Sequence, residues 1–513
     1  MLASHQSIRR VSLKTSALIA LVIGTSSIAS ASTTATVTVD PATVLSTIPS
    51  TAAGINTAVW DGDLLDSAVP SLMESAGIKA MRYPGGSTAD LYAWSTNSIV
   101  PGQTSYANPN NDFDAFMGVA KASGVTPIIT VNYGSNTAGN GGGTPAYAAS
   151  WVTYANVTKS YGVKYWEIGN EVYGNGEYDG VQWETDLHSA HDPTSYGTNV
   201  AAFASAMKAA DSSIKVGAVL AAPGNWPEGQ SPDWNSNVLA QCGSSIDFVI
   251  VHWYPESPGS ESDSALLAAP QDGIGGSGIA AMVSSLKSLI TQYCGSNAPN
   301  VQMFITETNS VSSNPGKQMN SLVNAMFIAD DIMTWLEGGI SNVDVWDLHN
   351  GSNDGNDSSS LYGTSTFGDY GILSNATSGE PAVDTPFPTY YGMQMLTHLG
   401  KAGDSMVSSS SSNSLLSVHA VKQANGDLAL MFVNKDLNNT DTASVSLTGY
   451  TPGSSATVYT YGKTSSAITS STISNAASSF SVSVAPYSLT TVVLTPGGSP
   501  PAAPTITSIT VEP

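Results

Sequence analysis

Short apolar runs and longer amphipathic stretches alternate along the chain from residue 54 to residue 400. The short runs are rich in β-branched and aromatic residues, a composition typical of strands. The longer stretches carry apolar residues at helical spacing. Because the two kinds of segment follow one another in turn, the pattern predicts parallel βα units. We expect strands at residues 54–56, 80–83, 127–133, 163–168, 215–220, 248–254, 303–307 and 343–348.

Helices are predicted between these strands and after the last one. The connection at residues 234–241 has the weakest helical pattern. The clearer helices are expected at residues 64–75, 113–122, 146–160, 196–210, 279–293, 322–336 and 390–399. Eight strands alternating with helices predict an α/β fold, a (β/α)8 barrel (TIM barrel), over residues 51–400.

The pattern changes after Gly400 to serine, threonine and valine with a period of two, as in residues 428–432. Asn425-Gly426 between two such runs is a strong hairpin signal. We therefore predict a C-terminal β-sandwich over residues 401–496, with Ser408 to Ser412 as a loop. A strand expected at 35–39, within the segment 32–50, is a candidate to join this sandwich. Residues 497–513 are rich in proline and glycine and are typical of a linker.

The first 31 residues have the pattern of an export signal. Arg9, Arg10 and Lys14 precede an apolar run over residues 17–23, and Ala29-Ser30-Ala31 is a small-residue cleavage site. The paired arginines also resemble a twin-arginine signal. We expect a secreted or periplasmic protein, with no membrane attachment after cleavage.

Charge and cysteine content narrow the possible partners. Cleavage after Ala31 removes three positive charges from a chain of net charge −23, which leaves −26. Such a chain is a poor partner for nucleic acid or for an anionic membrane. Cys242 and Cys294 could form one disulfide or remain two thiols, and both are expected on the barrel face away from the active site.

Two of the predicted strands end on a glutamate next to an amide residue. The strand at 163–168 runs into Gly169-Asn170-Glu171, and the strand at 303–307 ends on Glu307, followed by Thr308-Asn309. The carboxyl ends of barrel strands meet at the face that carries the chemistry. Two carboxylates there suggest cleavage of a glycosidic bond, with one as proton donor and the other as nucleophile or base.

At these positions the chain resembles the clan of retaining (β/α)8 glycoside hydrolases, over residues 54–400. Gly169-Asn170-Glu171 is similar to the acid/base motif of that clan, and Ile305-Thr306-Glu307 is similar to its nucleophile motif. The resemblance implies that Glu171 is the acid/base, that Glu307 is the nucleophile, and that Asn170 contacts the sugar 2-hydroxyl. Carboxyl groups about 5 to 5.5 Å apart are expected for this mechanism.

The resemblance also assigns supporting residues. It implies that Arg82 pairs with Glu307, that His252 and Tyr254 orient it, and that Trp346 forms a platform for the sugar. A cation beside Glu307 keeps it ionised, whereas the negative charge of Glu307 is expected to raise the pKa of Glu171. Asn132 and Trp94 complete the candidate substrate-binding residues.

Within the clan, the segment Met81-Arg82-Tyr83-Pro84-Gly85-Gly86, with Tyr92 and Trp94 after it, looks most like the α-L-arabinofuranosidases. Asn56 stands where those enzymes usually carry an acidic residue, and residues 307–309 are also similar to β-glucuronidases. Recognition of a uronate usually needs a cation, and among the lysines only Lys317 lies soon after a catalytic strand end. Neutral plant polysaccharide is therefore the favoured substrate. An endo-acting glucanase or xylanase and a non-catalytic glycan-binding protein remain alternatives.

The other acidic residues receive structural interpretations. Glu167 is expected to be structural, and Glu177, Glu184 and Asp186 to be loop and surface charges. Residues 353–357 are rich in oxygen ligands but lack the spacing of a calcium loop, so a solvated loop is favoured. No metal or cofactor is expected, because the retaining mechanism needs none.

Overall fold

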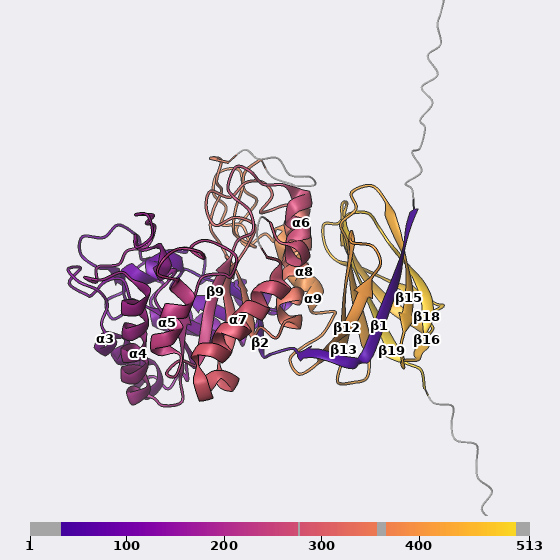
Figure 1. Ribbon diagram of the computed structural model, residues 1–513. Coiled ribbons are helices and arrows are strands. Elements are labelled where there is room, and N and C mark those ends of the chain that lie inside the picture. Colours follow the sequence, from indigo (N-terminus) through magenta and orange to yellow (C-terminus); the bar gives the residue numbers. More distant parts are fainter. Residues whose placement is uncertain (1–31, 275–276, 357–365, 499–513) are drawn as a thin grey trace, which may run out of the picture.

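The computed structural model describes residues 32–274, 277–356 and 366–498, which form a barrel with a β-domain beside it (Figure 1). The export signal predicted at 1–31 and the tail after residue 498 lie outside the described residues. Within the described part, no helix combines the length and the apolar character needed to cross a membrane.

Eight parallel strands close into a barrel in the order β10-β11-β2-β3-β6-β7-β8-β9. This arrangement confirms the predicted (β/α)8 fold, and all eight expected strands are present with ends shifted by a few residues. Their bounds are β2 (Thr51–Asn56), β3 (Ala80–Tyr83), β6 (Thr126–Val131), β7 (Tyr165–Ile168), β8 (Lys215–Val219), β9 (Phe248–Trp253), β10 (Gln302–Thr308) and β11 (Asn342–Val345).

The helices surround the barrel, and side-chain caps fix where several of them begin. Asp112, Asp192 and Asp233 each accept a hydrogen bond from a backbone N–H in the first turn of the helix that follows, which satisfies a donor that the helix leaves unpaired. The helices are α1 (Val69–Ala76), α2 (Phe113–Ser123), α3 (Pro145–Val152), α4 (Pro193–Ala210), α5 (Trp234–Cys242), α6 (Asp263–Asp272), α7 (Ile279–Tyr293), α8 (Leu322–Glu337) and α9 (Pro388–Leu396). Helix α6 was not predicted.

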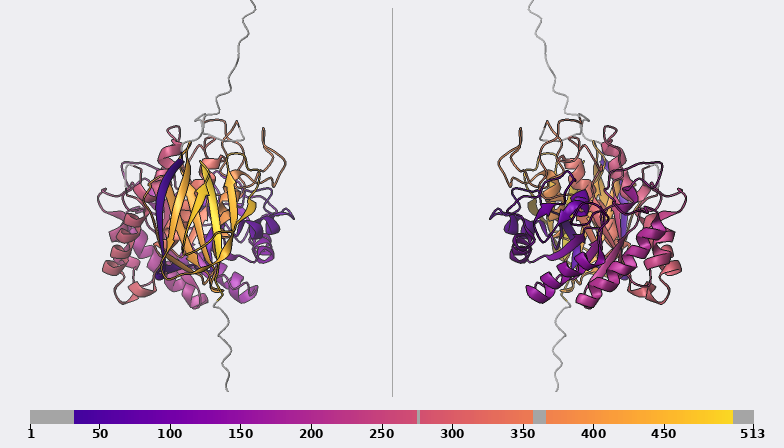
Figure 2. Two further views of the ribbon diagram at one scale, coloured as in Figure 1. Left: turned by 90° about the vertical axis from the view of Figure 1, so that its right-hand side faces the viewer. Right: turned by 90° about the vertical axis from the view of Figure 1, so that its left-hand side faces the viewer.

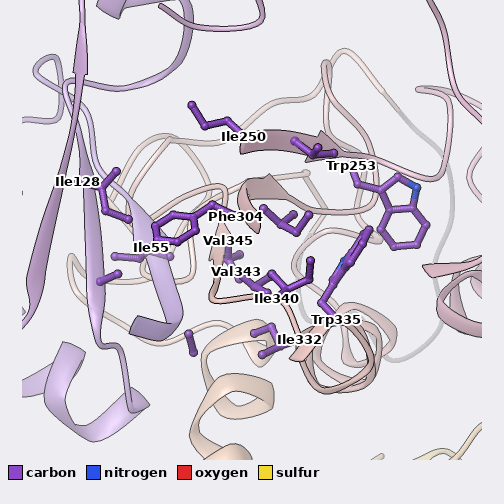
Figure 3. Close-up of a cluster of buried hydrophobic side chains, with 14 of the residues drawn as sticks. Ile55, Ile128, Ile250, Trp253, Phe304, Ile332, Trp335, Ile340, Val343 and Val345 are labelled. Carbon is purple, nitrogen blue, oxygen red and sulfur yellow. The ribbon is translucent and has the colours of Figure 1, made fainter. Parts of the chain in front are cut away.

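The barrel core consists of aromatic and branched side chains from both faces of the strands. Inside, Phe304 of β10 packs against Phe248 and Tyr165, with ring centroids 4.7 and 5.0 Å apart. Between the strands and the helices, Trp253 of β9 meets Trp335 of α8 edge to face at 5.7 Å (Figure 3). The strands are therefore buried on both faces, as parallel sheets usually are.

The C-terminal domain is a nine-stranded mixed sheet that curls around its own apolar core. β1 (Ser32–Thr47) pairs antiparallel with β12 (Ser405–Ser411) and parallel with β15 (Thr440–Leu447), so the start of the chain is part of this domain (Figure 2). The expected hairpin at Asn425-Gly426 joins β13 (Leu416–Lys422) and β14 (Leu428–Asn434). The remaining strands are β16 (Pro452–Gly462), β17 (Thr469–Ile473), β18 (Ser479–Val484) and β19 (Ser488–Pro496).

The structure bears on two further expectations, a loop in the C-terminal domain and the state of two cysteines in the barrel. The loop predicted at Ser408 to Ser412 is wrong, because residues 408–411 belong to β12 and their backbone pairs with β1. Cys242 and Cys294 are buried free thiols near the carboxyl ends of α5 and α7, where the helices end against the face of the barrel away from the catalytic strand ends. Burial raises the pKa of the Cys294 thiol to about 11.

Candidate active site

Glu171 reaches the barrel mouth through a sharp turn after β7. The strand ends at Ile168, Gly169 has φ 76°, and Glu171 itself is left-handed with φ 37°. A Cβ at position 169 would stand 2.8 Å from the Tyr133 Cβ, so only glycine fits there. A non-glycine residue in this conformation costs about 1 kcal/mol or more, and such strain is commonest at functional sites.

Glu307 reaches the same place through an irregularity in β10. Ile305 pairs with Val251, but the next paired residue, Glu307, lies opposite His252, so β10 contains one extra residue at this point. The bulge turns both Thr306 and Glu307 toward the interior. Thr306 contacts His252 Nε2 through its hydroxyl at 3.1 Å, and Glu307 contacts Arg82.

Arg82 is a buried cation that binds four side chains. Its Nη1 donates to Glu307 Oε1 at 2.7 Å and to Asn56 Oδ1 at 2.9 Å, its Nε donates to Glu167 Oε2 at 2.7 Å, and its Nη2 donates to Asn170 Oδ1 at 2.8 Å. Burial alone would lower the pKa of Arg82, but the two carboxylates raise it above its ordinary value. The expected contact with Glu307 is present, and Glu167 has the structural position that the sequence suggested.

The second oxygen of Glu307 and both oxygens of Glu171 receive other donors. The Tyr254 hydroxyl donates to Glu307 Oε2 at 2.7 Å. His252 Nδ1 lies 2.9 Å from Glu171 Oε1 and 3.4 Å from Glu307 Oε2. His252 was expected to orient the nucleophile, but its shorter contact is with the proposed acid/base. It therefore lies between the two glutamates.

Glu171 has two further partners, and they change its expected protonation. The Tyr173 hydroxyl donates to Oε1 at 3.1 Å and the Trp183 indole N–H donates to Oε2 at 2.6 Å. Burial raises the pKa of Glu171, but His252, Trp183 and Tyr173 together lower it below its ordinary value. The predicted raised pKa is wrong for the free protein, because these hydrogen bonds stabilise the carboxylate.

The two glutamates are close enough to act on one bond. One carboxylate oxygen from each, together with a His252 ring nitrogen, lie within 4.8 Å of one another. Oxygens this close favour the retaining arrangement, in which the carboxyl groups lie about 5 to 5.5 Å apart, over the roughly 6.5 to 9.5 Å of inverting enzymes. Three such ligands could also hold a metal ion, but Arg82 already neutralises Glu307 and disfavours a further cation there.

A cavity of about 610 Å³ opens onto Glu171. Its walls come from loops after several strands and are largely aromatic and uncharged apart from the catalytic group. The lining residues are Ser87, Glu171, Tyr173, Trp183, Ala222, Asn225, Trp226, His252, Trp253, Tyr254, Ser312 and Ser313. Neither lysine nor arginine is among these described residues.

The remaining predicted residues fall into two groups. Asn170 bonds Arg82, and the backbone N–H of Trp346 donates to the carbonyl of Thr308, next to Glu307, at 3.1 Å. Neither is among the residues that line the cavity, and the platform role of Trp346 stays a prediction. Asn132 and Trp94 do not line the cavity. Asn132 is buried and bonds the Tyr92 carbonyl and Ser135, whereas Trp94 stacks on Trp151 at 5.5 Å. Their contacts lie within the protein, and substrate binding by Asn132 and Trp94 stays a prediction.

Two acidic residues that were expected on the surface are buried. Glu184 Oε1 accepts from Asn170 Nδ2 at 2.8 Å and from the Ser87 hydroxyl at 2.6 Å. Burial, followed by the charges of Asp90 and Glu171, raises the pKa of Glu184 well above its ordinary value. Asp186 accepts from Asn175 at 3.0 Å. The loop after β7 folds back over the site, which the sequence pattern did not indicate.

The oxygen-rich segment at 353–357 is a loop bound to its neighbours. Asn353 Nδ2 donates to Asn314 Oδ1 at 2.7 Å and to the Pro315 carbonyl. Asp357 lies outside the described residues. The described part of this segment therefore uses its amide groups within the protein.

Residues 110–332 match the family described as glycosyl hydrolase family 79, N-terminal domain, and this span contains both Glu171 and Glu307. The predicted resemblance to this class of enzyme is thereby confirmed.

Curated relatives align with part of the chain. A probable α-L-arabinofuranosidase C of Aspergillus fumigatus is 27% identical over 195 residues, which are 33% of this chain and 34% of the relative. An intracellular exo-α-(1→5)-L-arabinofuranosidase of Streptomyces lividans is 25% identical over 240 residues, 41% of this chain and 33% of the relative. The chain spans about a third of the length of the curated relatives it matches.

Solved structures share the whole architecture. The α-L-arabinofuranosidase of Thermotoga maritima, solved as an arabinose complex, superposes with a TM-score of 0.67 at 19% identity and covers 90% of this chain and 99% of that one. A bifunctional glucanase-xylanase from a metagenome library reaches 0.65 at 16% identity over 91% of this chain and 100% of that one. At these identities the likeness concerns the fold: a barrel followed by a β-sandwich.

Proposed function

We propose that the protein is an exported, retaining glycoside hydrolase that acts on neutral plant cell-wall glycans, with α-L-arabinofuranosides as its leading substrates. The observation that carries the proposal is the arrangement of Glu171, His252 and Glu307, whose ligand atoms lie within 4.8 Å of one another beneath an uncharged aromatic cavity. Export rests on the sequence pattern of residues 1–31.

In the first step Glu307 attacks the anomeric carbon of the sugar. Arg82 and Tyr254 each donate a hydrogen bond to the Glu307 carboxylate at 2.7 Å, and these two donors fix the direction in which it attacks. As the new C–O bond forms, the glycosidic C–O bond breaks and the leaving oxygen takes a proton from Glu171. Glu171 must carry that proton when the leaving oxygen departs, and its Oε1 lies 2.9 Å from His252 Nδ1.

In the second step water releases the sugar from Glu307. Glu171, now ionised, takes a proton from the water as the water oxygen attacks the anomeric carbon, and the ester bond to Glu307 breaks. His252, Trp183 and Tyr173 lower the pKa of Glu171, and this environment favours the charged form that acts as the base. Two displacements on one carbon give retention of configuration.

The choice of arabinofuranoside rests on the partial alignments with arabinofuranosidases and on the neutral lining of the cavity. Arg82 is buried and occupied by its four partners, so it does not provide a cation for a uronate. A β-glucuronidase is therefore less well supported.

An endo-acting glucanase or xylanase is the second candidate, because the glucanase-xylanase structure matches the fold nearly as well. Trp183 and Trp226 are exposed in the cavity wall, as expected for an enzyme that also binds the sugar on the leaving side. The same two glutamates would carry the reaction.

The test is hydrolysis of aryl α-L-arabinofuranoside, β-xyloside, β-glucuronide and β-glucoside, with Glu307→Ala measured in parallel. We expect turnover of the arabinofuranoside and a loss on the order of 10⁴-fold or more in the variant. Activity confined to polymeric glucan or xylan would favour the endo-acting enzyme. No hydrolysis of any substrate would contradict the proposal and favour a non-catalytic glycan-binding protein. Full activity of Glu307→Ala would contradict the assignment of Glu307 as the nucleophile.

A further inference from the structure

The loop that follows Glu171 returns to it. Asn175 and Gln182 form an antiparallel bridge, and the Gly174 carbonyl accepts hydrogen bonds from the backbone N–H groups of Trp183 at 2.9 Å and Glu184 at 3.0 Å. These bonds fix the end of the loop against its beginning. Trp183 is thereby held next to Glu171 although the two are separated by a full loop.

Trp183 has one polar contact and one exposed ring. Its indole N–H donates to Glu171 Oε2 at 2.6 Å, whereas 43% of the residue's surface remains exposed. The ring lies directly on the backbone of Gly174, where a Cβ would stand 2.4 Å from the indole Cε2. The indole is therefore seated in a defined place, which requires glycine at position 174.

A second exposed indole stands beside the first. Trp226, in the loop after β8, is 37% exposed, and its ring centroid lies 5.2 Å from that of Trp183 at an angle of 49°. Tyr173 and Tyr178 pack edge-on against Trp226. Both tryptophans line the cavity that contains Glu171. Exposed tryptophans supported in this way are suited to stack on the apolar face of a sugar ring.

The position of this pair relative to Glu171 identifies the sugar that it would bind. In the proposed reaction Glu171 protonates the leaving oxygen, so groups that contact Glu171 from the cavity side stand on the side of the leaving group. Trp183 is such a group, and Trp226 extends the same surface.

We propose that Trp183 and Trp226 form the binding platform for the leaving-group sugar, and that Trp183 is in addition a positioning residue for Glu171 through its indole N–H. This inference rests on the proposed function and adds the neutral sugar on the leaving side as the ligand. Trp183 then takes part both in binding the leaving-group sugar and in holding the Glu171 carboxylate.

The two tasks can be separated by substitution. Trp183→Phe keeps an aromatic ring but removes the N–H donor, and Trp226→Ala removes stacking area without touching Glu171. Gly174→Ala keeps the indole but displaces it. Because Trp183 and Trp226 are exposed, their variants are expected to fold, and an unchanged melting temperature checks this.

The first readout is the pH dependence of kcat/KM, whose alkaline limb reports the pKa of the acid/base in the free enzyme. The Trp183 N–H stabilises the carboxylate, so its removal raises that pKa. We expect the alkaline limb to move to higher pH in Trp183→Phe and Gly174→Ala and to stay in place in Trp226→Ala. An unmoved limb in Trp183→Phe would overturn the positioning role.

The second readout is the ratio of kcat/KM for α-1,5-linked L-arabinobiose to that for methyl α-L-arabinofuranoside, since the methyl group has no ring to stack. We expect Trp226→Ala to reduce this ratio by about 2- to 10-fold. An unchanged ratio would overturn the platform. If the unsubstituted protein cleaves neither compound but cleaves another aryl glycoside, the proposed specificity for arabinofuranosides is wrong. The ratio is then measured with the disaccharide and the methyl glycoside of the sugar that the protein does cleave.

Discussion

The barrel mouth and the contact between the two domains each bury one charged side chain between two partners of opposite charge. At the mouth the buried cation Arg82 lies between Glu167 and Glu307, both at 2.7 Å. At the domain contact the buried anion Asp330 of α8 lies between His419 of β13 and Lys435, at 2.8 and 2.7 Å.

The two clusters differ in whether the charged groups around the central residue are themselves paired. Asp330 has donors on both oxygens, since Ser417 and Gln271 also bond it, and His419 is closed off by Glu337 at 2.8 Å. At the mouth, Glu307 and Glu171 direct oxygens toward one another within 4.8 Å, with Glu171 lining the cavity. A buried ionic cluster whose charged groups are all paired joins two domains, whereas one whose two carboxylates face each other beside a cavity can perform chemistry.

Removal of Arg82 should have the largest effect on stability. Arg82→Met leaves Glu167 and Glu307 buried without their cation, which we expect to cost about 3 to 5 kcal/mol in the free energy of unfolding. Activity should be lost as well, because the Glu307 carboxylate then lacks the cation that binds and orients it. Urea unfolding measures the cost, and Lys208→Met, which removes a partly exposed pair with Asp247, is the control with an expected cost below about 1 kcal/mol. Equal midpoints for the two variants would contradict the comparison.

Removal of Asp330 should destabilise the protein somewhat less and leave the chemistry intact. Asp330→Asn leaves Lys435 and His419 without their anion, but His419 can lose its proton, so we expect a cost of about 3 kcal/mol. The activity of each folded molecule should equal that of the unsubstituted protein, because Asp330 contacts neither the cavity nor the glutamates. A loss of kcat at a temperature where the variant is folded would show that the two clusters are coupled.

The domain contact should also make stability depend on pH. Burial would lower the pKa of His419, but Glu337 and Asp330 raise it to about 10. A raised pKa in the folded state contributes stability that is complete below the ordinary value of 6.5 and is lost as the pH rises through 10. We expect the free energy of unfolding to fall over this range by roughly 1.4 kcal/mol per pH unit for each such histidine.

His349, whose pKa is also raised to about 10 by Asp384 and Asp61 against the effect of burial, contributes to the same loss. Urea midpoints between pH 6 and pH 10 measure it, and His419→Gln should give a flatter curve that approaches the unsubstituted one at high pH. A stability curve of His419→Gln that runs parallel to that of the unsubstituted protein would show that His419 does not cause the loss of stability at high pH.

The pattern of the sequence was sufficient for the barrel and for the strands that carry the glutamates. Each strand is a compact apolar run, and a carboxylate directly after such a run lies at the face of the barrel where the carboxyl ends of the strands meet. Helix α6 was missed because Pro270, a residue that usually ends helices, lies inside it. The strand at Ser405–Ser411 was missed because serines carry little apolar signal and the partner, β1, is hundreds of residues away.

The site was predicted where strands determine it and missed where loops do. Arg82, Tyr254, Glu171 and Glu307 come together because the strand ends meet. Trp183 and Glu184 reach the glutamates through a folded loop whose closure depends on Gly174 and on backbone bonds that no periodicity reveals. The pKa of Glu171 was predicted wrongly because the contact with His252 lowers it first, followed by the hydrogen bonds from Trp183 and Tyr173 in that loop.

The central claim, a covalent bond between the sugar and Glu307, can be tested by mass spectrometry on Glu171→Ala with an activated aryl α-L-arabinofuranoside. The aryl group leaves without a proton, whereas hydrolysis of the intermediate lacks its base, so the intermediate should accumulate. We predict an added mass of one sugar residue, located on the peptide that contains Glu307. Turnover without an adduct, or an adduct on another residue, would contradict the mechanism.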